Sequence, residues 1–196
     1  MLEWNEIVRS LTGAYEVFLD RPNASQHFDL SINGFWRSFR AIVLVAPLYA
    51  LSAIAERAVA LGDPSVAADF NDGLFILDKA AALIIDWVAL PVVLALLASR
   101  IGIARTYPAF IIVRNWAAVL SILPFALIGL LFTMGTFGPD TADILTLTGL
   151  IIVLRYNYLI ARRVMEAPVG LAVAVVVGDF ILSMAIASAV DLVFGQ

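Results

Sequence analysis

Cysteine is absent from this 196-residue sequence, and histidine and lysine each occur once, as His27 and Lys79. Without cysteine the chain can form no disulfide, iron–sulfur cluster or thiolate-bound metal site, and it has no cysteine nucleophile. A single histidine cannot build a histidine-based metal cluster or a pair of haem ligands. The net charge of −4 and the pI of about 4.8 argue against nucleic-acid binding, which needs a basic surface. We therefore expect no metal, no cofactor and no nucleic-acid partner.

Charge is also scarce, since only 14% of the residues are charged, 62% are apolar and the mean hydropathy is +0.97. A soluble domain usually contains about 25% charged and about 45–50% apolar residues. Because lipid is the simplest cover for the excess apolar surface, the composition indicates an integral membrane protein. The first residues, MLEWNEIVRSLTG, lack the basic start and continuous apolar run of a secretory signal peptide. All basic residues but Lys79 are arginine, a bias typical of GC-rich bacteria, so we expect a bacterial inner membrane.

Five long apolar stretches dominate the chain, and each is near the length of about 20 residues that a helix needs to cross a bilayer. They cover residues 41–61, 74–98, 108–134, 142–161 and 168–194. The sequence therefore predicts an all-α, polytopic bundle of five transmembrane helices. We place this transmembrane domain at residues 36–196 and a cytoplasmic or interfacial segment at residues 1–35.

Residues 2–19 have the spacing of an amphipathic helix, with apolar side chains three and four positions apart. These side chains are Trp4, Ile7, Val8, Leu11, Tyr15, Phe18 and Leu19. Such a helix beside a membrane span usually lies in the plane of the membrane surface. The alternative is that it packs on the cytoplasmic ends of the bundle, and the sequence leaves both open.

Among the charged residues inside the predicted spans, where an unpaired charge is costly, two acids and two arginines stand out by their depth. Asp86 and Asp179 lie near mid-bilayer, and Arg114 and Arg155 each lie about six residues in from the cytoplasmic end of their helix. Two acids and two bases at neighbouring depths could pair with one another and fix the packing. They could instead line a polar path or a binding site.

Two further features inside the spans predict contacts between helices. Asn115 and Asn157 lie close to the intramembrane arginines, and their amides could bond across helices. Gly170, Ala174 and Gly178 are spaced four apart, and such small residues let helix backbones approach closely. We therefore treat the three small residues as a candidate helix-packing face.

The sequence contains few groups that could support catalysis. No histidine lies in any span, so an intramembrane serine nucleophile would have no histidine base. Asp86 and Asp179 are the one mid-span pair of acids, and neither belongs to a recognisable protease motif. The loops hold about a dozen residues at most, which leaves no room for a soluble catalytic domain. We expect no enzymatic activity.

The layout resembles the Yip1-like superfamily, over about residues 36–194. The shared features are a cytoplasmic N-terminal segment, five spans, short loops and an external C-terminus. The tyrosine-glycine-proline signature of eukaryotic members is absent, and SLTGAYEVFLDRP is only loosely similar to it. The resemblance implies a membrane-organising protein that binds partners and is not an enzyme.

Two functions are compatible with these features. The first is a non-catalytic protein that binds lipids, other membrane proteins or a second copy of itself, as an accessory, assembly or organising subunit. The alternative is a small-solute or ion transporter or channel that uses the buried groups Asp86, Arg114 and Asp179.

The distribution of arginine between the loops predicts the orientation in the membrane. Residues 99–107 and 162–167 carry arginines, whereas residues 62–73 and 135–141 carry acids and no basic residue. Because arginine-rich short loops stay in the cytoplasm, the N-terminus should be cytoplasmic and the C-terminus periplasmic. Topology reporters fused after Arg100 and after Arg162 should both report the cytoplasmic side. Reporters active on the outer side at both positions would overturn this orientation.

Overall fold

The computed structural model describes residues 3–194, and these residues form helices with no β-strand among them. Five helical segments are long and apolar enough to cross a membrane, which confirms the predicted all-α polytopic bundle. The shorter helical elements are α1 (Trp4–Phe18), η1 (Ala24–His27), α2 (Ile32–Ser38), η2 (Phe39–Ala41) and α4 (Pro64–Ala67). The long helices are α3 (Ile42–Gly62), α5 (Asp72–Leu97), α6 (Tyr107–Thr133), α7 (Pro139–Arg163) and α8 (Val169–Phe194).

The first membrane-spanning segment begins earlier than the apolar run suggests. Helix α2 continues through η2 into α3, so the apolar helical segment covers Ile32–Gly62. Ser31 starts α2, because its side chain accepts a hydrogen bond from the Gly34 amide at 3.1 Å. The boundary predicted after residue 35, between the N-terminal segment and the transmembrane domain, falls inside α2. Helix α2 packs against α6, as does the rest of the first span.

Local sequence signals also set the starts of α4 and α5. The Asn71 side chain accepts hydrogen bonds from the Gly73 and Leu74 amides and begins α5. Asp63 caps α4 in the same way through the Ser65 amide. These caps satisfy amide groups that have no carbonyl partner in the first turn of a helix.

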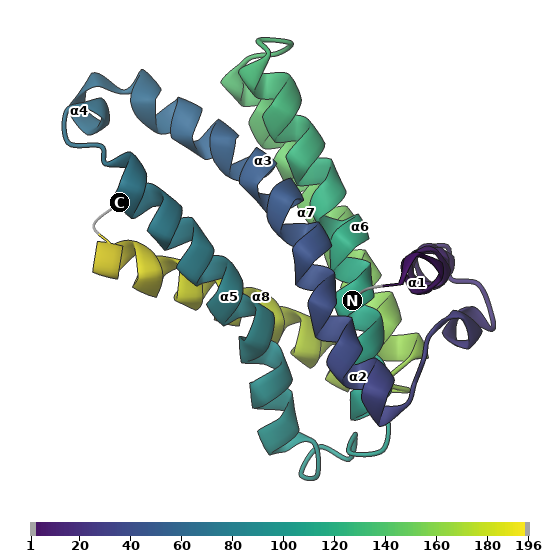
Figure 1. Cartoon of the computed structure of the whole chain (residues 1–196). Coiled ribbons are helices and arrows are strands. Elements are labelled where there is room, and N and C mark those ends of the chain that lie inside the picture. Colours follow the sequence, from purple (N-terminus) through teal and green to yellow (C-terminus); the bar gives the residue numbers. More distant parts are fainter. Residues whose placement is uncertain (1–2, 195–196) are drawn as a thin grey trace.

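The five long helices form two arms (Figure 1). Toward their outer ends α6 and α7 diverge from α5 and α8, whereas the end of α3 lies close to the start of α5, where α4 connects the two. One arm consists of α3, α6 and α7, with α3 and α6 in the most extensive contact. The other arm consists of α5 and α8. The arms meet near the opposite end, where α7 packs on α8 and the Tyr107 hydroxyl of α6 donates to the Pro91 carbonyl of α5 (2.9 Å).

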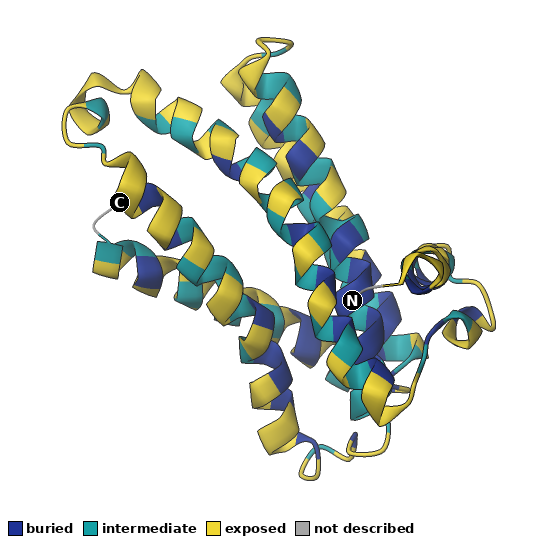
Figure 2. Ribbon diagram, viewed as in Figure 1, coloured by how far each residue is buried: buried dark blue, intermediate teal, exposed yellow. Residues whose placement is uncertain are grey.

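The best-packed region surrounds the first half of α6, whereas the diverging ends of the arms are largely exposed (Figure 2). Ile111, Val113, Trp116 and Ala117 of α6 are buried there. The exposed side chains on the outer faces are mostly apolar, as expected for surfaces that contact lipid. Inside a membrane such packing is stabilised by van der Waals contact, since lipid is as apolar as the side chains.

Helix α1 packs against α6 and α7 through its small and polar side. The buried positions are Glu6, Ser10, Gly13, Ala14 and Val17. The Tyr156 hydroxyl of α7 donates to the Ala14 carbonyl at 2.6 Å. Trp4, Val8 and Tyr15 from the predicted apolar side remain exposed, with 74% of the Trp4 surface accessible. The helix therefore packs on the bundle and also presents an apolar side that suits a membrane surface.

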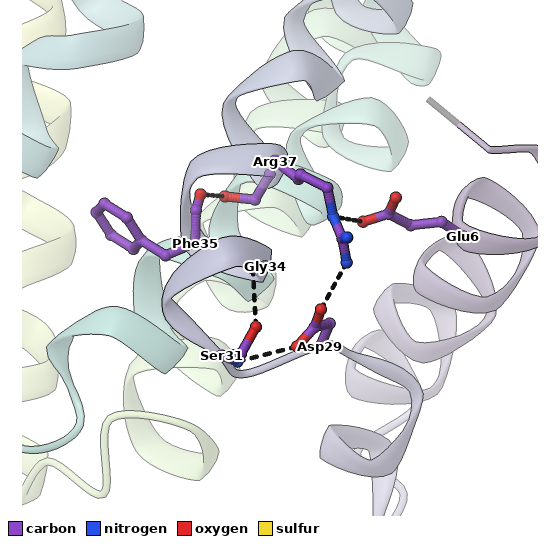
Figure 3. Close-up of polar contacts among 7 residues, drawn as sticks. Glu6, Asp29, Ser31, Gly34, Phe35 and Arg37 are labelled. Atoms are coloured by element: carbon purple, nitrogen blue, oxygen red, sulfur yellow. Dashed lines mark hydrogen bonds and ion pairs between the residues drawn. The ribbon is translucent and has the colours of Figure 1, made fainter. Parts of the chain in front are cut away.

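Arg37 joins α1 to the start of the first span (Figure 3). Its guanidinium group donates to Glu6 of α1 (3.1 Å) and to Asp29, which precedes α2. Hydrogen bonds from Ser31, together with the charge of Arg37, lower the pKa of Asp29 below its ordinary value. A lowered carboxyl pKa keeps this contact ionised at neutral pH, and the contact weakens only in acid.

Gly129 on α6 allows the closest approach of α6 to α3. A Cβ atom at this position would lie 3.0 Å from the Leu51 carbonyl oxygen and 3.2 Å from Ser52 Cα. A Gly129→Leu substitution should therefore force α3 and α6 apart and destabilise the protein by about 1–3 kcal/mol. The measurement is the free energy of unfolding in mixed micelles.

Gly178 on α8 provides the matched control, because a Cβ atom there would meet nothing within 4 Å. Gly178→Leu should leave the stability of the monomer within about 0.5 kcal/mol of the wild type. Equal losses for the two variants would contradict the close packing of α3 on α6.

Candidate functional site

All five long helices line an open cavity of about 370 Å³ within the membrane-spanning bundle. Its wall is mostly apolar and includes Trp87, Phe125 and Phe180. The polar side chains that face it are Tyr49, Asp86, Arg114, Ser121, Asn157, Asp179 and Ser183. A largely apolar pocket with a few convergent polar groups is the usual form of a small-molecule site.

Arg114 and Asp179 form an ion pair across the cavity, from α6 to α8. The Arg114 Nη2 atom lies 3.0 Å from Asp179 Oδ1 and 3.3 Å from Oδ2. Their side chains are only 13% and 14% exposed. Because each charge lies next to its opposite, the pair avoids most of the penalty for an isolated charge in the membrane.

Asp86 on α5 faces the same cavity in a different environment. Its Oδ1 atom accepts a hydrogen bond from the Ser183 hydroxyl of α8 at 2.6 Å. Within residues 3–194, no basic side chain lies within ion-pair distance of Asp86. When all three groups are ionised, Asp86, Asp179 and Arg114 together carry a net charge of −1. The cavity is therefore suited to a positively charged group.

The structure brings together four of the six polar residues singled out in the sequence. Asp86, Arg114, Asn157 and Asp179 line the cavity. Asn115 instead points away from it, and its amide donates to the Ser38 hydroxyl at 3.0 Å in a fully buried contact. Successive residues on a helix point about 100° apart, and here Arg114 faces the cavity while Asn115 falls on the side of α6 that faces Ser38.

Arg155 also lies outside the cavity, on an exposed side of α7. Its guanidinium group donates to the Phe18 carbonyl at the end of α1, at 3.5 Å. Asp86 therefore has no second arginine opposite it, and the possible set of two acids with two bases does not form.

Three contributors to the cavity were not recognised as site residues from the sequence. In the sequence, Ser121 and Ser183 are small side chains with no motif around them. In the structure both line the cavity, and the Ser183 hydroxyl donates a hydrogen bond to Asp86. Tyr49 comes from α3, and no local pattern predicts that its side chain lies near α5 and α8. The spacing of Asp179 and Ser183, four residues apart on α8, is the one signal that could have identified the serine.

The candidate helix-packing face on α8 is not used within this chain. Gly170, Ala174 and Gly178 are exposed, and a Cβ atom at either glycine would meet nothing within 4 Å. These three residues form an outward stripe, here called the α8 outer face.

In the part of the chain that the structure describes, no three His, Cys, Asp or Glu side chains are arranged to hold a metal ion. Comparisons with protein-family models, with curated proteins and with solved structures gave no match. The resemblance to the Yip1-like superfamily therefore stays a prediction.

The Arg114–Asp179 ion pair gives a direct test of this geometry. Arg114→Gln and Asp179→Asn should each destabilise the protein by about 3–5 kcal/mol, because each leaves an uncompensated buried charge. The double variant should lose clearly less than the sum of the two single losses. Unfolding in mixed micelles measures all three variants, and strictly additive losses would show that the two charges do not interact.

Proposed function

We propose that this chain is a non-catalytic membrane carrier that binds a small solute with a positively charged group in its five-helix cavity. The observation that carries the proposal is Asp86, which faces the cavity with a serine hydroxyl beside it and no basic partner within the described residues. A carboxylate in this position favours a ligand cation, because the cation would supply the missing opposite charge.

The cavity wall supports a ligand that also has an apolar body. Trp87, Phe125 and Phe180 offer aromatic surface beside the carboxylate, and aromatic faces attract cations. The volume of about 370 Å³ falls within the range usual for small-molecule pockets, about 300–1,000 Å³. An organic amine fits these properties better than a bare metal ion or an anion.

The arrangement of the helices supports transport rather than static storage. The α3/α6/α7 arm and the α5/α8 arm both contribute to the cavity, and α3 meets α5 mainly through two ion pairs near α4, Glu56 with Lys79 and Arg57 with Asp72. Relative movement of two helix groups around a central site is a common way to expose it to alternate sides. We place this carrier in a bacterial inner membrane, with a cytoplasmic N-terminus and a periplasmic C-terminus, on the distribution of arginine.

The α8 outer face supports a second candidate function, the binding of another membrane protein or a second copy of this chain. Its small residues are exposed to the membrane and leave room for a close helix neighbour. Contacts of this kind are a usual basis for helix association in lipid. Such an accessory or organising role is compatible with a ligand cavity, because the α8 outer face and the cavity use different sides of α8.

Substitution of Asp86 tests the carrier. Benzylamine, benzyl alcohol and benzoate share an aromatic body and differ in charge, so they are suitable probes for calorimetric titration of the detergent-solubilised protein. Benzylamine should bind most tightly of the three. Asp86→Asn should weaken benzylamine binding by at least about tenfold, because it removes the carboxylate that faces the amine.

Asp140→Asn is the matched control, since Asp140 is an exposed acid in the first turn of α7, remote from the cavity lining. This variant should bind benzylamine as the wild type does. The carrier proposal fails if benzylamine does not bind, or if Asp86→Asn binds it unchanged.

Substitution on the α8 outer face tests association. Ala174→Leu should dissociate an oligomer or a co-purified partner, because the larger side chain blocks close approach of a second helix. The measurement is the molar mass of the purified protein by light scattering in mild detergent. Val173→Leu enlarges the neighbouring exposed position and should leave the mass unchanged. A wild-type protein that is already a lone monomer would rule out this second function.

A further inference from the structure

A second charged cluster, separate from the central cavity, lies where α3, α5 and α8 approach one another near the C-terminal end of α8. Its centre is Lys79 of α5, whose Nζ atom lies 2.9 Å from Glu56 of α3 and 3.3 Å from Asp78 of α5. The third acid, Asp191 of α8, lies 4.0 Å from the same Nζ atom. Three carboxyl groups thus surround one ammonium group, and the central cavity includes none of these four side chains.

Asp78 is the exceptional member of this cluster. It has no exposed surface, and neither of its carboxyl oxygens makes a hydrogen bond among the described residues, although the Lys79 ammonium lies 3.3 Å from one of them. A buried carboxylate normally accepts hydrogen bonds, because burial without them carries a large penalty. The carboxyl groups of Asp78 and Asp191 converge on the same Lys79 Nζ atom, at 3.3 and 4.0 Å, but two ionised carboxylates can only accept. One added proton would turn one of the two groups into the missing donor.

We propose that Asp78 and Asp191 form a proton-binding site in which the two carboxyl groups share one proton at neutral pH. The other charged groups that face the pair cannot replace that proton. Lys79 supplies one positive charge, which Glu56 already shares at 2.9 Å. The nearest arginine on α3, Arg57, is bound to Asp72 through two hydrogen bonds, at 2.6 and 3.1 Å. The cluster therefore has an excess of acid, and a shared proton removes one of the excess charges.

The site has a route to the surface. An open cavity of about 330 Å³ is lined by Glu56, Asp69, Lys79 and Asp191. The Asp191 side chain is 43% exposed, whereas Asp78 behind it is fully buried. Asp191 is therefore placed to exchange a proton with water, and Asp78 to hold it away from water.

The proton site also lies near the central cavity. Asp78 precedes Asp86 by eight residues on α5, about 12 Å along the helix axis. Tyr49 lines the central cavity and lies within electrostatic range of Asp78 and Asp86. The proton site does not depend on the proposed carrier function, because its evidence comes from a different set of side chains.

Infrared difference spectroscopy of the full chain in vesicles tests the site, since a protonated carboxyl group has its own C=O band that shifts in D₂O. At neutral pH the wild type should show this band. Asp78→Asn and Asp191→Asn should each reduce it by the intensity of one carboxyl group, because the new amide donates to the remaining carboxylate. Asp69→Asn changes an exposed acid at the same opening and should leave the band unchanged.

Two outcomes would overturn the proposal. The first is a band of wild-type intensity in Asp78→Asn and Asp191→Asn. If Asp78→Asn does not fold, Asp191→Asn alone decides, because Asp191 lies at a partly exposed helix end. The second is a band that disappears when sodium chloride replaces choline chloride at constant pH, since a sodium ion would then be the ligand of the same oxygens.

Discussion

The Arg114–Asp179 ion pair connects the two arms of the molecule at the level of the central cavity. In lipid, where water cannot solvate a charge, either residue alone would be severely destabilising, so the two helices are held at a distance that keeps the charges together. The Arg114–Asp179 pair also makes the cavity polar, and Asp86 of α5, Asn157 of α7 and Ser183 of α8 line the same cavity. Asp86 can share this polar surrounding without a basic partner of its own, and its unmatched charge is what distinguishes the cavity from a purely structural ion-pair network.

Hydropathy predicted five spans correctly because each span depends on a local property, about 20 apolar residues in succession. Local hydropathy does not predict which polar residues of different helices contact one another. Arg114 and Asp179 are 65 positions apart, and their meeting depends on how the two arms are placed. The ambiguity of α1 has a similar origin. Its apolar side is obvious in the sequence, but lipid and protein are both apolar, so the pattern does not reveal that the small side containing Gly13 and Ala14 packs on the bundle.

Among the described residues, three ion pairs cross from one arm to the other. Arg114 of α6 binds Asp179 of α8. Near α4, Glu56 of α3 binds Lys79 of α5, and Arg57 of α3 binds Asp72 of α5. The outermost of them, Arg57 with Asp72, is exposed to a degree at which such pairs contribute little. Besides the packing of α7 on α8 and the Tyr107–Pro91 hydrogen bond, the arms are held by ion pairs at two levels, Arg114 with Asp179 and Glu56 with Lys79. The central cavity lies between the arms that these contacts join.

At the level of Arg114 the α5/α8 arm carries Asp179 and Asp86, and at the level of Glu56 it carries Lys79 with Asp78 and Asp191. Any movement that separates the arms must leave some of these carboxylates with fewer cations nearby. A ligand cation next to Asp86 would supply the positive charge that Arg114 withdraws, and would favour the separated arrangement. At the other level the opposite arm withdraws the acid Glu56, which leaves Lys79 to Asp78 and Asp191, so a proton on that pair would favour the closed arrangement. Both effects follow from the rule that a ligand shifts a conformational equilibrium only through its different affinity for the two states. Binding at one level would thus be felt at the other, because both depend on the separation of the same two arms.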